Sequence, residues 1–316
     1  MNEGIAYRPA RRDELAAAAE VYVRADDELD QRLHGRSLRE PAGEEGDGAA
    51  ALADLTLMYE DGPDRVWVAV RGDAVLGVAA AAIRERHWHL VYLFVLPGEQ
   101  GRGLGRALLD RIHAVGVAAG CDVFTLQASD DPKALTRYLT LGLAPQPPSI
   151  DLRATAPTFP GARWDDGLEP QPLLADDPAV LETVGDIDRL VRGVRRPQDL
   201  RRWLDEGARG ALLARRDTGA PAGYYLVSVR GGRGRIGPVA AVDGERFAQV
   251  LERALAAAGE QNDAGLGWRV DLPGENRAAI VPLFAAGFRP RRLSAFFASA
   301  AIGRFDRYVF HDEDLL

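Results

Sequence analysis

The sequence lacks several features that would place it in a specialised class of protein. It has one cysteine, Cys121, so no disulfide can form within the chain. It has one lysine, Lys133, its arginines are dispersed, and its net charge is −8, which disfavours a nucleic-acid partner. No run of 18 or more apolar residues occurs, so we expect no membrane partner. The N-terminus has no basic segment followed by an apolar core, so we expect a cytoplasmic location.

The first half of the chain alternates short apolar runs with amphipathic stretches, which predicts an α/β fold. Asp13 is expected to cap the first helix, and Gly142 to end the last one. We expect strands at 4–9, 66–70, 75–83, 90–96, 122–127 and 149–153, and helices at 13–24, 49–59, 103–117 and 132–140.

The same pattern restarts in the second half. We expect strands at 211–215, 223–229, 235–241 and 268–272, and helices at 245–257 and 276–285. Gly142 and Gly287 are 145 residues apart, and Gly77 and Gly223 are 146 apart. A single repeat of this length predicts a duplicated domain. We therefore expect domains at 1–155 and 169–316, joined by a linker at 156–168 where Pro and Gly stand among acidic residues.

A glycine segment, Gln100-Gly101-Arg102-Gly103-Leu104-Gly105, follows the expected strand at 90–96 and opens a helix. The first N–H groups of a helix are unpaired and its dipole favours an anion, so this arrangement is typical of a phosphate site. A P-loop would need Gly-Lys-Ser/Thr, and a Rossmann site would follow the first strand. The remaining alternative is a glycine turn that serves only helix packing.

Two stretches in this half carry a family resemblance. Residues 93–109, LFVLPGEQGRGLGRALL, resemble motif A of the GCN5-related N-acetyltransferase (GNAT) superfamily, whose signature is Gln/Arg-x-x-Gly-x-Gly/Ala. Asp131-x-x-Ala134-x-x-x-Tyr138-x-x-x-Gly142 resembles motif B. The resemblance covers residues 4–155 strongly and 169–300 in outline. It implies two tandem domains of the α/β (α+β) class, each with a mixed, mostly antiparallel central sheet flanked by helices.

The resemblance also implies acetyl-CoA as co-substrate and a primary amine, on a small molecule or a protein, as acceptor. Leu93 and Val95 would pair with the pantetheine arm like an added strand. An N–H near Leu93 or Phe94 would polarise the acetyl carbonyl. Asp131 stands where many members have Asn, and Lys133 is either a phosphate contact or a surface residue. The pyrophosphate would be held by the segment Gln100, Gly101, Arg102, Gly103, Leu104, Gly105 and Arg106.

Amine acetylation needs a base for the ammonium proton and an acid for the leaving thiolate. Tyr138 matches the family's usual proton donor; the alternative is a packing tyrosine. His89 lies where several relatives carry a base, and an imidazole titrates near neutral pH; the alternative is a neutral histidine bonded within the sheet. His87 and Glu85 are the other candidate bases. The alternative for Glu85 is a solvated turn residue. His87-x-His89 lacks a visible third ligand, so we expect no metal.

The second copy is expected to be degenerate. An offset of 145 maps Gln100 onto Glu245, Gly103 onto Ala248, Gly105 onto Val250 and Tyr138 onto Leu283, so the cradle and the proton donor are both missing. This copy would shape the acceptor pocket, hold the halves together or form a homodimer contact. The family usually builds its acceptor pocket from the first two helices and their connection, here residues 26–46.

The acceptor is not identified by the sequence. Mycothiol synthases are tandem members of similar length, but their competent site resembles the C-terminal copy, so we expect a different acceptor here. An aminoacyl-tRNA-dependent transferase is disfavoured by the acidic charge. The alternative outside enzymes is a non-catalytic acyl-CoA-binding sensor, which would not require Tyr138 or a base.

Overall fold

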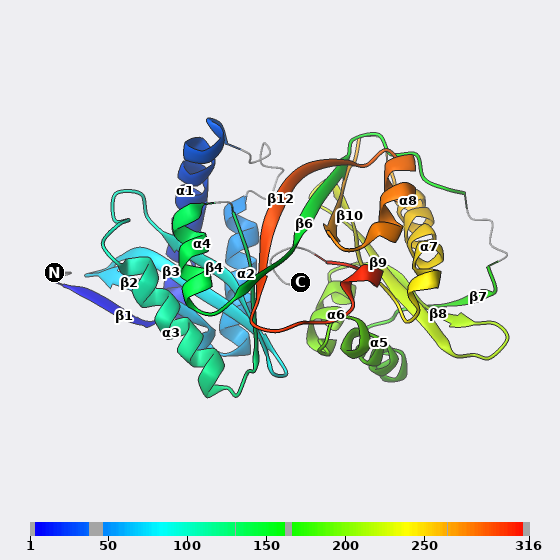
Figure 1. The fold of residues 1–316 in the computed structure, drawn as a ribbon, viewed down its shortest axis with the longest axis horizontal. Helices are drawn as coiled ribbons and strands as arrows, with labels where there is room; N and C mark the ends of the chain where they lie inside the picture. Colours follow the sequence, from blue (N-terminus) through cyan, green and yellow to red (C-terminus); the bar gives the residue numbers. More distant parts are fainter. Residues whose placement is uncertain (1–3, 38–46, 130, 162–165, 264, 312–316) are drawn as a thin grey trace. The chain divides into compact units, whose positions relative to one another are not determined.

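The computed structural model describes residues 4–37, 47–129, 131–161, 166–263 and 265–311 (Figure 1). The chain divides into two compact units. Unit 1 consists of residues 1–126 and 130–144, and unit 2 of residues 127–129 and 145–316.

The strands of unit 1 follow one another in the hydrogen-bonded order β1-β2-β3-β4-β5 (Figure 1). Its neighbouring strands are antiparallel except for β4 and β5, which are parallel. Helices α1 and α2 pack on one face, and α3 on the other. The elements are β1 Ile5–Pro9, α1 Leu15–His34, α2 Asp47–Asp61, β2 Val66–Arg71, β3 Ala74–Arg84, β4 His87–Val95, α3 Leu104–Ala118, β5 Val123–Ala128 and α4 Pro132–Thr140.

The first helix differs from its prediction at both ends. Asp13 is not its cap, because residues 12–14 form a 3-10 turn and the carboxylate of Glu14 accepts from the backbone N–H of Arg11 at 2.8 Å. The helix continues to His34 and ends at Gly35, whose φ of 68° is left-handed. Charged residues fill the second half of the helix, so the apolar periodicity by which its first half was predicted does not continue there. The sequence therefore predicted a helix that ends too early.

Strands β4 and β5 share only a short parallel register. It runs from His87↔Val123 to Leu90↔Leu126, whereas β4 continues to Val95. A register shift against β3 falls at this same point of β4. Residues 91–95 therefore have β3 on one edge and no register partner on the other among the described strands of unit 1. Such an edge offers backbone groups to a ligand.

From β7 to α8, unit 2 repeats the element order of unit 1; strand β6 precedes this repeat, and β12 and β13 follow it. Its strands follow the order β12-β6-β11-β10-β9-β8-β7, and β13 pairs with β10. The elements are β6 Ala144–Ala154, β7 Leu168–Pro172, α5 Pro178–Val191, α6 Pro197–Asp205, β8 Arg209–Arg215, β9 Pro221–Arg230, β10 Arg233–Ala241, α7 Phe247–Glu260, β11 Gly267–Pro273, α8 Ile280–Ala285, β12 Arg289–Ala298 and β13 Tyr308–Val309. The predicted fold class, mixed α/β with mostly antiparallel sheets, is confirmed.

Two segments near the expected domain boundary belong to unit 2. Strand β6, expected to be the last strand of the first domain, pairs antiparallel with β11 from Ser149↔Pro273 to Ala154↔Trp268. The described part of the expected linker also packs on unit 2. The ring of Phe159 lies 5.2 Å from that of Trp268, and Asp166 forms an ion pair with Arg253 at 2.7 Å.

Candidate active site

The glycine segment forms an open loop at the start of α3. Gly101 and Gly103 have φ angles of 78° and 86°, in the left-handed region that favours glycine. No atom lies within 4 Å of the position that a side chain would take at either residue. Gly103 is the N-cap of α3 and has no side chain to cap the free N–H groups of the first turn. Buried Leu104 anchors that turn in the core. The first turn of α3 therefore has N–H groups without an intrahelical partner beside open space, as a diphosphate site requires.

Side chains around the loop fix its position. Glu99 forms a bidentate ion pair with Arg71 at 2.9 and 3.0 Å, which lowers the pKa of Glu99. Arg102 binds the same carboxylate at 2.8 Å. The side-chain amide of Gln100 donates to the carbonyl of Val95 at 3.1 Å, so the loop is tied to the end of β4. Arg106 is exposed. The side chains of Glu99, Arg102 and Gln100 are thus engaged in contacts within the protein, and the backbone of the loop is the part positioned for a ligand.

Arg137 is a cationic residue at the loop that the sequence did not single out. It lies on α4, and its Nη1 is 3.1 Å from where a Cβ of Gly105 would be. Gly105 thus makes room for a guanidinium beside the first turn of α3. The signal for it was present, because Arg137 directly precedes Tyr138 in motif B, but nothing in the sequence indicated which way it points.

Asp131 has structural partners. Its carboxylate caps α4 by accepting from the N–H of Lys133 at 3.1 Å, and it pairs with Arg32 of α1 at 3.0 Å. These contacts join the C-terminal end of α1 to the start of α4. A coenzyme contact at Asp131 stays a prediction, as does one at Lys133, whose side chain is exposed.

Tyr138 is buried in α4, with 6% of its surface exposed. Burial raises the pKa of its phenol to about 12. The phenol therefore stays protonated throughout the physiological range. This is the form that a proton donor for a leaving thiolate requires.

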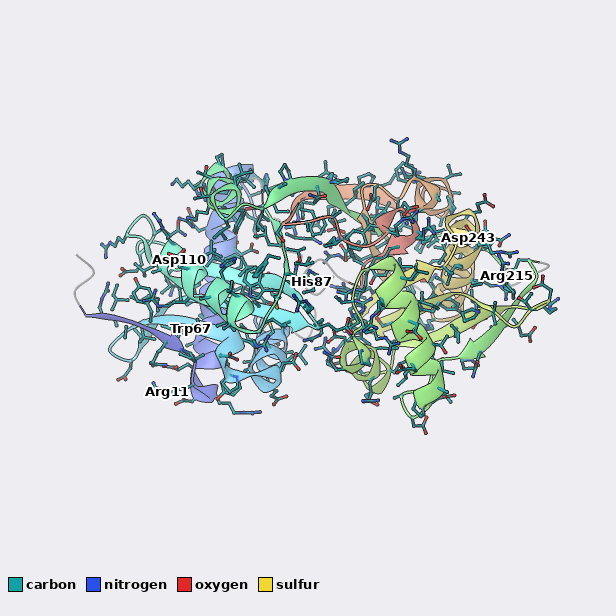
Figure 2. All side chains as sticks on the ribbon, turned by 60° about the horizontal axis from the view of Figure 1, so that its bottom comes forward. Arg11, Trp67, His87, Asp110, Arg215 and Asp243 are labelled. Carbon is teal, nitrogen blue, oxygen red and sulfur yellow. The ribbon has the colours of Figure 1, made fainter. Side chains whose placement is uncertain are left out.

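His89 and His87 are linked through Thr125 of the neighbouring strand. Nδ1 of His89 lies 2.9 Å from the hydroxyl oxygen of Thr125, and Nε2 of His87 lies 2.6 Å from it. Both imidazoles are buried on β4 (Figure 2 labels His87). The hydroxyl has one proton and can donate to only one of them. If it donates to His87, then Nδ1–H of His89 donates to the hydroxyl, which leaves Nε2 of His89 as a proton acceptor.

The remaining basic candidate, Glu85, lies in the β3–β4 turn with a left-handed φ of 51° and is exposed. This is the end of β4 remote in sequence from the glycine loop. Among the residues that the structure describes, no three or more His, Cys, Asp or Glu side chains group as metal ligands do. Thr125 was missed because a single threonine in an apolar strand carries no signal of its own.

An aromatic cluster lies between α1 and the far half of β4. Tyr22 of α1 contacts Tyr92 and Phe94 with ring centroids 5.1 and 4.9 Å apart. The hydroxyl of Tyr92 donates to Asp54 of α2 at 3.0 Å. The expected acceptor region at 26–46 lies partly outside the described residues. The Tyr92–Asp54 pair joins β4 to α2, and sequence reasoning did not find it.

In the described part of the second copy, residues of other kinds stand at the positions of Tyr138 and His89. Leu283 of α8 takes the place of Tyr138: the carbonyl of each accepts from the N–H five residues on, at 3.0 and 3.2 Å. Arg235 pairs with Arg269 on the parallel strands, as His89 pairs with Thr125. An arginine cannot act as a base at neutral pH.

The loop before the third helix of each copy also differs in length. It spans residues 96–103 in the first copy and 242–246 in the second, three residues fewer. The single offset of 145 across this loop is therefore wrong, and Gly103 matches Arg246 rather than Ala248. The carboxylate of Asp243 accepts from the N–H of Glu245 at 3.0 Å, so a side chain caps this loop in the second copy.

A sheet with diverging parallel strands, a glycine-opened helix beside them and a buried phenol define an acyl-coenzyme A-dependent transferase. The model of the acetyltransferase (GNAT) family matches residues 32–142. A mycothiol acetyltransferase of Clavibacter michiganensis is 30% identical over 266 residues, covering 77% of this chain and 83% of the relative. The chain belongs to the GNAT family, and it is an N-acetyltransferase.

Solved structures share the fold over nearly the whole chain. A putative acetyltransferase from Pyrococcus horikoshii has a TM-score of 0.72 at 18% identity, covering 98% of this chain and 94% of that one. A tandem GNAT protein from the clavulanic acid biosynthesis pathway has a TM-score of 0.58 at 17% identity, covering 93% and 98%. In the described part of the chain, every helix is too short or too polar to cross a membrane.

Proposed function

We propose that this chain transfers an acetyl group from acetyl-CoA to a primary amine at a single site in unit 1. The observation that carries the proposal is the open glycine loop at the start of α3, beside a strand edge without a register partner in unit 1. The N–H groups of 101–106 hold the pyrophosphate, and the edge of Leu93 to Val95 pairs with the pantetheine arm. Arg137 adds positive charge at the same place.

The acid and the base come from two different elements. Nε2 of His89 takes a proton from the acceptor ammonium, directly or through water, and so gives the neutral amine that attacks, while Thr125 holds Nδ1 in the protonated form. The new C–N bond forms as the C–S bond breaks, and the phenol of Tyr138 gives its proton to the departing sulfur. The proton that the acylated nitrogen then loses restores the phenol. Burial keeps that phenol protonated until it is needed.

The acceptor proposal rests on two observations that point in different directions. Two relatives are named mycothiol acetyltransferase. The first acceptor to test is therefore the amine that those enzymes use. The placement of the cradle in the N-terminal copy favours a different amine, as the sequence indicated. We propose a small-molecule amine as the acceptor. The experiment compares the acceptor of mycothiol acetyltransferases with other small amines, and so separates these two possibilities.

The test measures thiol release from acetyl-CoA with the acceptor of mycothiol acetyltransferases and with a panel of small amines. Amine-dependent release, lost in Tyr138→Phe, supports the enzyme. Tight coenzyme binding with no release for any amine supports the alternative, an acyl-CoA-binding sensor. Release with the first acceptor alone would overturn the expectation against mycothiol chemistry.

A further inference from the structure

The parallel strands of the second copy also diverge, but their gap is filled. Strands β10 and β11 share a register only from Arg233 to Arg235 on β10. Beyond it, β13 pairs antiparallel with β10 through Val239↔Val309 and Ala240↔Tyr308. The N–H of Phe310 then donates to the carbonyl of Asp271 on β11 at 3.0 Å. The segment 305–310, which we call the C-terminal strand segment, thus lies between the two diverging strands.

This segment is part of the core of unit 2. Phe305, Tyr308, Val309 and Phe310 are each at most 4% exposed. Tyr308 and Phe310 pack in the cluster with α5 and α6, whereas Val309 packs in the cluster with α7. Alternate residues therefore face opposite sides of the sheet, as they do in any internal strand.

Buried polar groups hold the segment in register. The amide of Asn276, itself fully buried, donates to the carbonyl of Tyr308 at 2.8 Å. The guanidinium of Arg196 donates to the hydroxyl of Tyr308 and pairs with Asp188 at 2.9 Å. Arg307 donates to the carbonyl of Val242 at 3.0 Å, and its guanidinium lies against Gly244. The segment thus also covers the shortened loop before α7.

The position of the segment matches the pantetheine edge of the first copy. The offset of 146 between Gly77 and Gly223, which holds across the preceding hairpin, places Leu93 at Val239 and Val95 at Ala241. Val239 and Ala240 are the β10 residues that pair with β13, on the edge that faces β11. A strand of the chain itself therefore takes the backbone positions that the added strand of a ligand would take.

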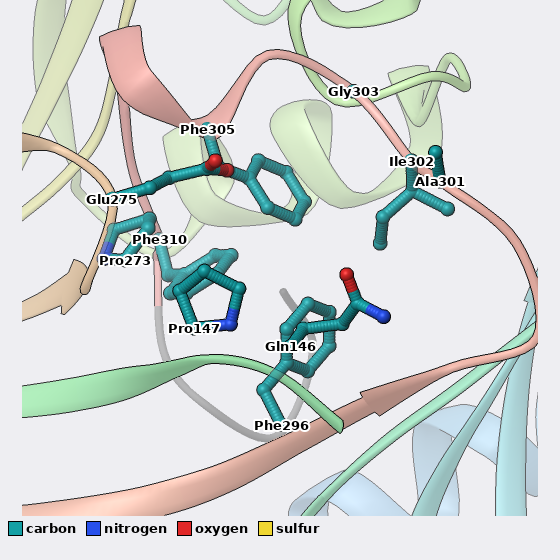
Figure 3. A pocket seen from close by; sticks show the side chains of 10 residues that line it. All are labelled: Gln146, Pro147, Pro273, Glu275, Phe296, Ala301, Ile302, Gly303, Phe305 and Phe310. Carbon is teal, nitrogen blue, oxygen red and sulfur yellow. The ribbon is translucent and has the colours of Figure 1, made fainter. Parts of the chain in front are cut away.

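We propose that the C-terminal strand segment is the permanent occupant of the second copy's coenzyme groove, so that the chain binds one coenzyme only. The pocket that remains beside the segment has a volume of about 180 Å³ and is lined by Phe296, Phe305 and Phe310, with Glu275 at one side (Figure 3). Ligand sites usually enclose roughly 300–1,000 Å³. The remaining space is therefore too small for a pantetheine arm.

Hydrogen exchange of the full chain tests the occupant directly. Without coenzyme, the amides of 239–241 and 271–272 are expected to be protected, and those of 93–95 to exchange at least tenfold faster. Saturating coenzyme A should then protect 93–95 and leave 239–241 unchanged. Protection of 239–241 only on adding coenzyme A, or two coenzymes per chain by calorimetry, would overturn the proposal.

Two truncations supply the matched comparison. A chain ending at His311 keeps the segment and is expected to retain the protection of 239–241 and the thermal midpoint. A chain ending at Arg304 removes it and should lose that protection and bind an apolar dye. If that chain does not fold, Asn276→Ala serves instead, and faster exchange at 239–241 is expected. Unchanged protection in both would refute the inference. Failure of coenzyme binding in unit 1 would refute the proposed function and leave this inference standing.

Discussion

Nδ1 of His89 lies 2.9 Å from the hydroxyl of Thr125, which also lies 2.6 Å from His87. This relationship makes the role proposed for His89, that of the base, testable through Thr125. Thr125→Val removes the group that fixes the protonation of Nδ1, whereas Thr125→Ser keeps it. We expect Thr125→Val to lower kcat about tenfold or more, and Thr125→Ser to retain most of it.

Replacement of the imidazole itself separates His89 from His87. His89→Gln should lower kcat about 10²–10⁴-fold and remove the acidic limb of the pH–rate profile. His87→Gln should have the smaller effect and keep that limb. An acidic limb that persists in His89→Gln but disappears in His87→Gln would reverse the assignment.

Tyr138→Phe keeps the buried ring and removes only the hydroxyl. We expect kcat to fall about 10²–10⁴-fold, with a thermal midpoint close to that of the parent chain. Because burial raises the pKa of Tyr138 to about 12, its deprotonation should not limit activity at any pH below about 11. The measurement is kcat from pH 6 to 10, and an unchanged kcat in Tyr138→Phe would assign the residue to packing alone.

Gly103→Glu places a carboxylate in the loop that we propose holds the diphosphate. We expect the Kd for coenzyme A to rise at least 100-fold, because like charges repel there and the site is built from backbone donors. Gly120→Glu is the matched control: its φ of 75° imposes the same backbone strain, again with open space around the side chain, at the other end of α3. Titration calorimetry of both variants checks the cradle, and retained binding in Gly103→Glu would reject it.

Glu14 makes the stability of unit 1 depend on pH in the acid range. Hydrogen bonds from Arg8, with help from Arg11, lower the pKa of Glu14 from its ordinary 4.5 to about 2. A lowered folded-state pKa stabilises above pH 4.5, and this contribution is lost as pH falls from about 4.5 to 2. We expect Glu14→Gln to lower the free energy of unfolding by about 1–2 kcal/mol at pH 7, an amount reduced by the partial exposure of Arg8.

The control for this pair is Glu60→Gln. Glu60 pairs with Arg12 at 2.8 Å, but both side chains are more than half exposed. Such a pair contributes little, so denaturant curves of Glu60→Gln should match those of the parent chain. Equal losses in the two variants would show that burial of Glu14 does not matter.

The sequence predicted those elements whose signal is local. The helix at 132–140 was predicted to the residue, because Asp131 and Pro132 open it and Gly142 ends it. The strands around the hairpins at Gly77 and Gly223 were predicted within one to three residues at each end. The glycine loop was found because its left-handed backbone conformation favours glycine, and closely spaced glycines are visible in the sequence.

The missed features depend on contacts distant in sequence. Helices α5 and α6 and strands β7 and β12 were not predicted, although Pro178 and Pro197 each stand at a helix start. Strand β13 has two residues and exists only because β10 and β11 diverge around it. Arg137 matters because it lies beside Gly105, and Thr125 because it contacts His89. No local sequence pattern connects the two residues of either pair.

The C-terminal strand segment has a consequence for how the protein behaves at low coenzyme supply. A strand joined covalently to the sheet that it completes is held at a fixed and very high local concentration. Dilution, dialysis or a competing nucleotide cannot remove it, unlike a diffusing ligand. The groove of unit 2 is thus always filled, whereas a domain without such a segment would fill its groove only at saturating coenzyme. The folding of unit 2 therefore does not depend on the supply of coenzyme.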